Sequence, residues 1–161
     1  MGNFSLPEVF KIVQCHEPET ADAIDSTSDI ISCKNLKKLW VVFHHYSGGG
    51  DLDFVVTWYE CTDVAGGTTA IITATSPIWY NTDTSAADLL TRATDAATFT
   101  IDTTLQKDQI WVLEWDPALF SAGYDCFHIV TTGGHASNHC SIMYFGLPRY
   151  QSDVVVSAIT D

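Results

Sequence analysis

Positive charge is scarce in this sequence. Only 7 Lys and Arg stand against 20 Asp and Glu in 161 residues, which gives a formal net charge of −13 at pH 7. A field of that sign repels phosphate backbones and anionic lipid head groups. We therefore expect neither nucleic acid nor a membrane surface among the partners of this protein.

Long apolar runs are also missing. No window approaches the roughly 18 apolar residues of a membrane span, and the segment 1–5 lacks the basic stretch and apolar run of a signal peptide. The chain length suits one domain around one core. We expect a soluble protein that folds in a cytosol.

The five cysteines form no recognisable motif. Their number is odd, no CxxC pair occurs, and three of them lie inside strand-like runs. Reduced, partly buried thiols are therefore expected, as is usual in a reducing compartment.

Helical periodicity is nearly absent, with only a turn or two expected at 85–92 and a single turn at 116–120. The chain instead carries short runs of β-branched and aromatic residues, separated by Gly, Asn, Asp, Ser and Thr. The predicted strands are residues 8–14, 29–32, 38–46, 53–62, 70–75, 98–103, 109–114, 126–132 and 140–145.

These strands predict an all-β fold, an antiparallel β-sandwich of jelly-roll type with eight to ten strands. Glycine-rich turns such as 47–51 favour antiparallel pairing of sequential strands. We assign residues 1–148 to the sandwich domain and 149–161 to an extended C-terminal arm. Such an arm can lie on its own domain or add to the edge of a neighbouring subunit.

Several predicted strands are apolar on both faces. In residues 39–46 one face carries Leu39, Val41, Phe43 and His45, and the other carries Trp40, Val42, His44 and Tyr46. One face of a sandwich strand lies in the core, so a second apolar face predicts a further apolar neighbour, such as another protein chain.

Enzyme signatures are missing from the sequence. There is no GxSxG elbow, and no glycine-rich loop is followed by the Lys and helix of a phosphate site. Neither His135 and His139 with Cys126 and His128, nor the acidic loop 81–88, has a metal-site spacing. We predict no catalytic residue, no cofactor and no metal.

Two clusters leave alternatives open. The five tryptophans, Trp40, Trp58, Trp79, Trp111 and Trp115, suit core and interface packing, and they also suit a sugar-binding face. Lys34, Lys37 and Lys38 place three of the seven basic residues in one segment, as a solvated strand entrance or as a contact for an acidic partner surface.

Several stretches, in this order and spacing, resemble a family of small structural proteins from the capsid region of tailed bacteriophages. The resemblance implies a virion protein, assembled in the host cytoplasm, that binds the capsid exterior as a decoration or cement protein and bridges subunits of the major capsid protein. It carries over no catalytic residue. The stretches are residues 28–35, 38–42, 60–67, 99–101, 123–126 and 144–150.

Self-association is expected as well, with a homotrimer as the predicted form, because clustering around a symmetry axis covers second apolar faces. The candidate contact residues come from the two-faced strand, the basic segment and the arm. They are Trp40, Val42, Tyr46, Lys34, Lys37, Lys38, Arg149, Tyr150, Val154, Val155 and Val156.

Other functions remain open at this point. One is a carbohydrate-binding β-sandwich module or lectin that uses an exposed Trp79 or Trp115. A second is a hydrolase with a carboxylate pair, for which Asp53 and Glu114 are candidates. A head-fibre or tail position in the virion is a third.

Overall fold

The structure is a computed structural model that describes residues 5–21 and 28–150. It contains eleven described strands, one short α-helix and one turn of 3-10 helix. All paired strands run antiparallel. The prediction of an all-β antiparallel sandwich is therefore confirmed, with eleven strands among the described residues instead of eight to ten. No helix in this part of the chain is long and apolar enough to cross a membrane.

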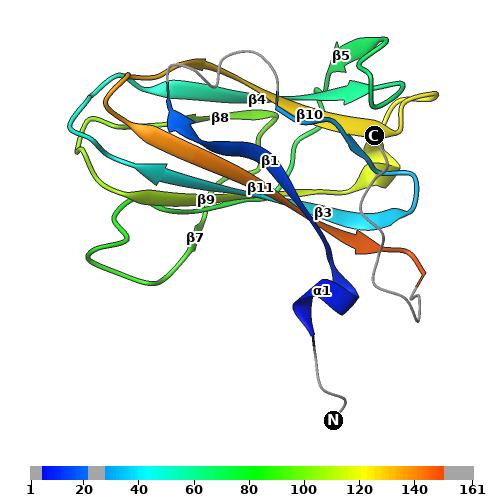
Figure 1. Ribbon diagram of the computed structural model, residues 1–161, viewed down its shortest axis with the longest axis horizontal. Helices are drawn as coiled ribbons and strands as arrows, with labels where there is room; N and C mark the ends of the chain where they lie inside the picture. The colour runs from blue at the N-terminus through cyan, green and yellow to red at the C-terminus, as the bar shows by residue number, and fades with distance from the viewer. Residues whose placement is uncertain (1–4, 22–27, 151–161) are drawn as a thin grey trace.

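The strands form two sheets, which lie as two layers in Figure 1. The six-stranded sheet has the order β1 (Lys11–Thr20), β11 (His139–Pro148), β3 (Leu36–Tyr46), β9 (Gln109–Trp115), β6 (Ile78–Asn81), β7 (Thr91–Arg92). The five-stranded sheet has the order β2 (Ile31–Ser32), β10 (Cys126–Gly133), β4 (Phe54–Cys61), β5 (Thr69–Ile71), and β8 (Thr98–Ile101) also pairs with β4.

Most strands that follow one another in the chain do not pair, which corrects the expected pairing of sequential strands. The glycine-rich loop at 47–51 carries the chain from β3 in one sheet to β4 in the other, and it joins no hairpin. β9, β10 and β11 likewise alternate between the sheets (Figure 1). A turn signal in a sequence shows that the chain changes direction, but not which strand it then pairs with.

The N-terminal boundary also differs from the prediction. Residues 8 and 9 belong to the helix α1 (Leu6–Val9), and the strand starts at Lys11 and runs on to Thr20. Pro7 sits in the first turn of α1, where its fixed φ suits a helix and its missing N–H is not needed. Pro18 lies inside β1, which is tolerated because β1 is the edge strand of its sheet.

The elements between β5 and β10 were only partly predicted. Strands β6 and β7 are absent from the predictions, because neither is long enough to show an alternating pattern. Residues 85–92 form turns and the short strand β7, and no helix. The turn expected at 116–120 is present as the 3-10 helix η1 (Pro117–Leu119), in which the Asp116 carboxylate accepts a hydrogen bond from the Ala118 backbone N–H.

The core fills the space between the sheets. Leu39, Val41 and Phe43 point inward from β3, as the alternation predicts, and none of them has any exposed surface. Phe99 of β8 packs between the sheets, edge-on to Phe43 at 5.3 Å and stacked on Trp111 at 5.0 Å between ring centroids. Aromatic contacts of this kind add to the free energy gained by apolar burial.

A buried asparagine joins two loops at one end of the sandwich. The Asn138 carboxamide accepts hydrogen bonds from the backbone N–H groups of Gly48 and Gly50 at 3.0 and 3.2 Å, and it donates to the Gly50 carbonyl at 3.0 Å. A Cβ at position 48 would collide with the Ser137 backbone, so this close approach requires glycine. The loops of β3–β4 and β10–β11 are thereby fixed to each other.

Two histidines are buried in the sheets. His45 points into the core and His44 points outward, as predicted, and the ring nitrogens of His45 and His128 find no hydrogen-bond partner in the described part of the chain. The His45 ring lies 5.7 Å from Phe54, and the His128 ring lies 5.1 Å from Tyr59. Burial lowers the pKa of both rings below the ordinary value of 6.5, because it penalises the charged form.

These histidines predict how stability depends on pH. As the pH falls through 6.5, the unfolded chain protonates both rings while the folded chain keeps them neutral. The unfolded state then binds more protons, so the free energy of unfolding decreases. Urea unfolding at pH 7.5 and pH 5.5 should show this loss. His45→Gln with His128→Gln should reduce the loss, and the exposed control His44→Gln should leave it unchanged; equal losses in all three proteins would contradict the prediction.

Candidate functional site

The outward side of the six-stranded sheet carries a continuous apolar surface. Strand register sets Ile12, Phe145 and Trp40 side by side across β1, β11 and β3. The next row joins Met143, Val42, Val112 and Trp79 across β11, β3, β9 and β6. We call these residues the outer apolar face: Ile12, Trp40, Val42, Trp79, Val112, Met143 and Phe145.

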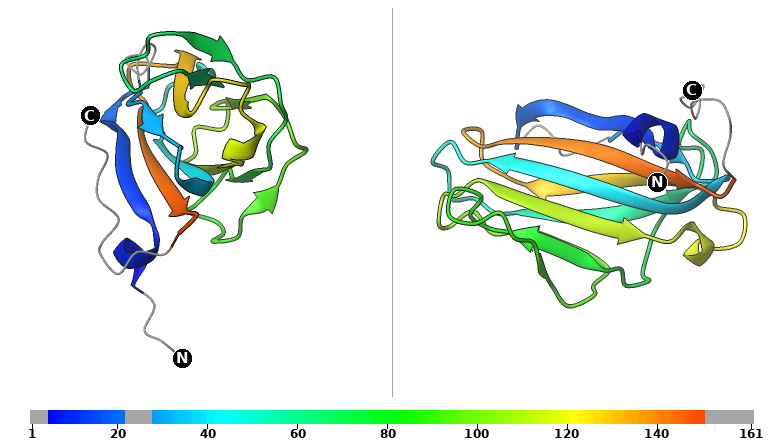
Figure 2. Two further views of the ribbon diagram at one scale, coloured as in Figure 1. Left: turned by 90° about the vertical axis from the view of Figure 1, so that its right-hand side faces the viewer. Right: turned by 90° about the horizontal axis from the view of Figure 1, so that it is seen from below.

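All seven side chains of this face keep exposed surface, and Met143 is 39% exposed. The right panel of Figure 2 shows β1, β11, β3 and β9 running side by side, with α1 at the end of the sheet where β11 finishes. As the alternation in residues 39–46 indicates, one side of β3 forms core, and the other side is apolar and keeps exposed surface; a further apolar neighbour for that side stays a prediction.

A groove lies where α1 meets this face. Its volume is about 290 Å³, and every residue that lines it is apolar: Leu6, Phe10, Trp40, Val42, Val112 and Phe145. The Phe10 backbone N–H closes the α1 turn on the Leu6 carbonyl at 2.9 Å, and the Phe10 ring then packs edge-on against Trp40 at 5.7 Å. The helix thus forms one wall of the groove and the sheet forms its floor.

A cationic pocket of about 490 Å³ lies at the same end of β3, lined by Lys37, Lys38, Asp116, Ala118, Arg149 and Tyr150. Lys38 and Trp40 are two residues apart on β3, so they share its outward side and the pocket adjoins the groove. Three of the seven basic residues of a strongly acidic chain thus meet beside its apolar groove.

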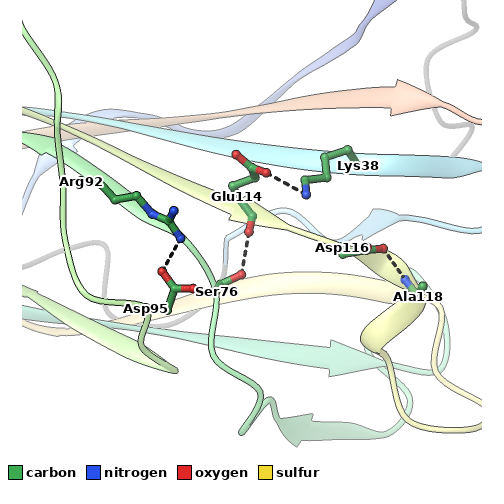
Figure 3. Close-up of polar contacts among 7 residues, drawn as sticks. All are labelled: Lys38, Ser76, Arg92, Asp95, Glu114, Asp116 and Ala118. Atoms are coloured by element: carbon green, nitrogen blue, oxygen red, sulfur yellow. Dashed lines mark hydrogen bonds and ion pairs between the residues drawn. The ribbon is translucent and has the colours of Figure 1, made fainter.

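Hydrogen bonds and an ion pair fix the walls of this pocket. The Lys38 ammonium lies 2.7 Å from the Glu114 carboxylate, and Asp116 is held at the start of η1 (Figure 3). Arg149 donates from its backbone N–H to the Asn35 carbonyl and from Nε to the Leu36 carbonyl, at 2.8 and 3.0 Å. Among the described residues, no ion pair within 4.0 Å involves Lys37 or Arg149.

The predicted contact residues separate into groups. Trp40 and Val42 lie in the groove, and Lys37, Lys38, Arg149 and Tyr150 line the cationic pocket, so six predicted residues are brought together.

The remaining predicted contact residues lie elsewhere. Lys34 pairs with Asp125 at 3.3 Å, away from the other two lysines. Tyr46 is 52% exposed at the far end of β3, beside His139. Val154, Val155 and Val156 lie outside the described residues.

Part of the groove was not predicted. Phe10 was missed because residues 8–14 were assigned to a strand, in which no wall over the sheet would form, and Leu6 preceded every predicted element. Phe145 was placed in a strand but not on a surface. Its signal was available, since Tyr144 and Phe145 are both large and apolar at adjacent positions, as are Trp40 and Val41.

Asp53 and Glu114, the carboxylates considered for hydrolysis, are engaged in structural contacts, as are the nearby carboxylates Glu60 and Asp116. Asp53 accepts from the Thr103 backbone N–H at 2.7 Å, and buried Glu60 accepts from the Ser121 N–H at 2.9 Å. Glu114 pairs with Lys38, and Asp116 caps η1. These groups hold the sandwich and its loops together and converge on no common cavity among those described.

The histidines and cysteines do not converge either. No group of three or more His, Cys, Asp or Glu side chains in the described ranges is arranged to hold a metal ion. All five cysteines are buried, and none forms a disulfide. Burial raises the pKa of Cys15 and Cys140 to about 12, so these thiols stay protonated near neutral pH.

The tryptophans divide between core and surface. Trp58 and Trp115 have no exposed surface, which rules out Trp115 as a stacking platform for a sugar. Trp79 lies on the outer apolar face and carries the Arg92 guanidinium over its ring at 5.6 Å. Arg92 also binds Asp95 at 2.6 Å (Figure 3).

The fold and this surface define an all-β sandwich with an exposed apolar face. No family model matches the chain, and no curated protein matches it. A solved structure titled Desmodium yellow mottle tymovirus aligns over 96% of this chain and 94% of its own chain, with 9% sequence identity and a TM-score of 0.14. A TM-score that low carries no argument about fold or function.

The outer position of Trp40 predicts a contrast between two substitutions. Trp58→Ala should lower the free energy of unfolding by about 3–5 kcal/mol, because it opens a cavity in the core. Trp40→Ala should cost less than about 1.5 kcal/mol, because its side chain keeps some exposed surface and lines an open groove, so its removal leaves no enclosed cavity. Urea unfolding measures both, and equal losses would show that Trp40 belongs to the folding core.

Proposed function

We propose that this protein is a structural virion component of a tailed phage, a decoration or cement protein that binds the capsid exterior and bridges major capsid subunits. The observation that carries the proposal is the outer apolar face with its groove, since a sheet that has already filled one core keeps a second apolar surface. Contiguous exposed apolar surface of this kind marks protein contact sites. The resemblance of the sequence stretches supplies the phage context.

We infer further that the sandwich is a jelly roll. The strand order β1-β11-β3-β9 faces β2-β10-β4-β8, and among these eight strands the chain changes sheets at every step except from β4 to β8, which pair. Eight antiparallel strands in two sheets with such connections are the arrangement of a jelly roll, which viral capsid and lectin domains share. The segment that contains β5, β6 and β7 is then an insertion, in which β6 and β7 widen the six-stranded sheet and β5 adds to the five-stranded sheet.

The electrostatics support a protein partner. A net charge of −13 keeps the free protein soluble and disfavours nucleic acid and membranes, while the cationic pocket gives an acidic surface one place to bind. We propose the major capsid protein and further copies of this chain as partners, with a trimer as the oligomer. The structural contacts of Asp53, Glu60 and Glu114 favour this function over a hydrolase.

A carbohydrate-binding module is the second candidate, and Trp79 is the observation that favours it. Its ring is partly exposed and lies next to Arg92, a pairing of flat apolar surface and polar groups that suits a pyranose. Glycan binding that is lost in Trp79→Ala and kept in Trp40→Ala would favour this candidate.

Co-sedimentation tests the capsid proposal. The protein, mixed with undecorated shells assembled from a tailed-phage major capsid protein, should pellet with the shells and saturate. Trp40→Glu should weaken shell binding at least tenfold, because it places a charge in the apolar contact. The control Val55→Glu changes a side chain that is 37% exposed on the other sheet and should bind like the wild type. Failure of the wild type to pellet at saturating concentration would refute the proposal.

A further inference from the structure

We propose that the groove and the cationic pocket together receive residues 151–161 of a second copy of this chain. The inference rests on the self-association part of the proposed function and names the contact that produces it. Three features support it: the order of charged and apolar side chains along β3, the sequence of residues 151–161, and the place where the described chain ends.

On the groove and the cationic pocket, charged and apolar side chains follow one another in a fixed order. Along the outward side of β3, Lys38 comes first, then Trp40, then Val42, with about 6.6 Å between successive members of the row. Lys37 and Arg149 add positive charge at the Lys38 end, while Phe145, Phe10 and Leu6 add apolar walls around Trp40. A fitting ligand therefore carries an acidic group followed by apolar groups at strand spacing.

Residues 151–161 carry an acidic group followed by apolar groups. Asp153 is followed directly by Val154, Val155 and Val156, and the segment contains no basic residue. In an extended chain alternate residues lie about 6.6 Å apart on one side, the spacing of the row on β3. Asp153 then lies beside Lys38 and Arg149 when Val155 lies over Trp40. β-branched residues favour this extended form.

The position of the chain end favours a second copy over the same chain. Tyr150, the last described residue, lines the cationic pocket, so its own segment has to reverse direction at once to run along β3. Residues 149–161 contain no Gly, Pro or Asn; the turn-forming residues that follow Tyr150 most closely are Ser152 and Asp153, and Asp153 is already used in the contact with Lys38 and Arg149. A segment that continues onward meets the groove of a neighbour, and repetition of this contact closes a symmetric oligomer.

A complementation experiment tests the proposal with full-length chains. Val155→Asp disables the segment and leaves the groove intact, while Trp40→Glu disables the groove and leaves the segment intact. Analytical ultracentrifugation should show an oligomer for the wild type and for the control Val55→Glu, and monomers for each disabled variant alone. An equimolar mixture of the two disabled variants should form heterodimers with one chain of each variant. The intact groove of the Val155→Asp chain then binds the intact segment of the Trp40→Glu chain.

Further arms of the experiment exclude trivial explanations. Circular dichroism checks that each variant is folded, and Val42→Glu replaces Trp40→Glu if the latter is not. A labelled peptide of residues 151–161 should bind the Val155→Asp protein saturably, at least tenfold more tightly than a scrambled peptide does.

Three outcomes would overturn the inference: a monomeric wild type, oligomers that survive both substitutions, or a mixture that stays monomeric. The shell assay separates this inference from the proposed function. Shell binding by a wild type that is monomeric would refute the inference and leave the virion proposal standing. Complementation without shell binding would refute the virion proposal and leave the inference standing.

Discussion

The two-residue period of a β-strand is the constraint on which this structure depends. The central strand β3 gives one set of side chains to the core and the other set to the outside, and both sets include large apolar residues. The first set includes Leu39, Val41 and Phe43, which are buried in the core. Trp40 and Val42 belong to the second set, next to Phe145 of β11, and only α1 provides them with a partner among the described residues.

Long-range pairing makes that outer surface continuous. β11 and β3 pair across ten register positions, and β9 extends the same face, although these three strands come from distant parts of the chain. The few apolar side chains on the outward side of one strand thus become part of a broad surface only after the sheet is assembled. The cationic pocket arises in the same way, because Lys37 and Lys38 meet Arg149 where β3 begins and β11 ends.

Much of the fold follows from local sequence patterns. The strands at 38–46, 109–114 and 126–132 were predicted because runs of β-branched and aromatic residues are informative over seven or so positions. β6 and β7 are too short for that signal, and α1 depends on Pro7 in its first turn. Strand partners could not be predicted, because the loop at 47–51 has the composition of a hairpin turn and yet connects two sheets.

The candidate surface was predicted as a property of β3 alone. Alternation identified Trp40 and Val42 as outward and apolar, but no local pattern shows that Phe145, Val112 and Phe10 surround them. Lys34 was grouped with Lys37 and Lys38 by sequence proximity, and the change of direction between β2 and β3 sends it to Asp125 instead.

Oxidative footprinting of side chains, before and after assembly, tests most directly whether the outer apolar face is a contact surface. Hydroxyl radicals should modify Trp40 and Met143 in the free, monomeric protein, and their modification rates should fall at least fivefold when the protein is assembled with its partner. Ile71, which is 56% exposed on β5 of the five-stranded sheet, should react equally in both states. Unchanged rates at Trp40 and Met143, together with protection on the five-stranded sheet, would contradict the assignment of this face.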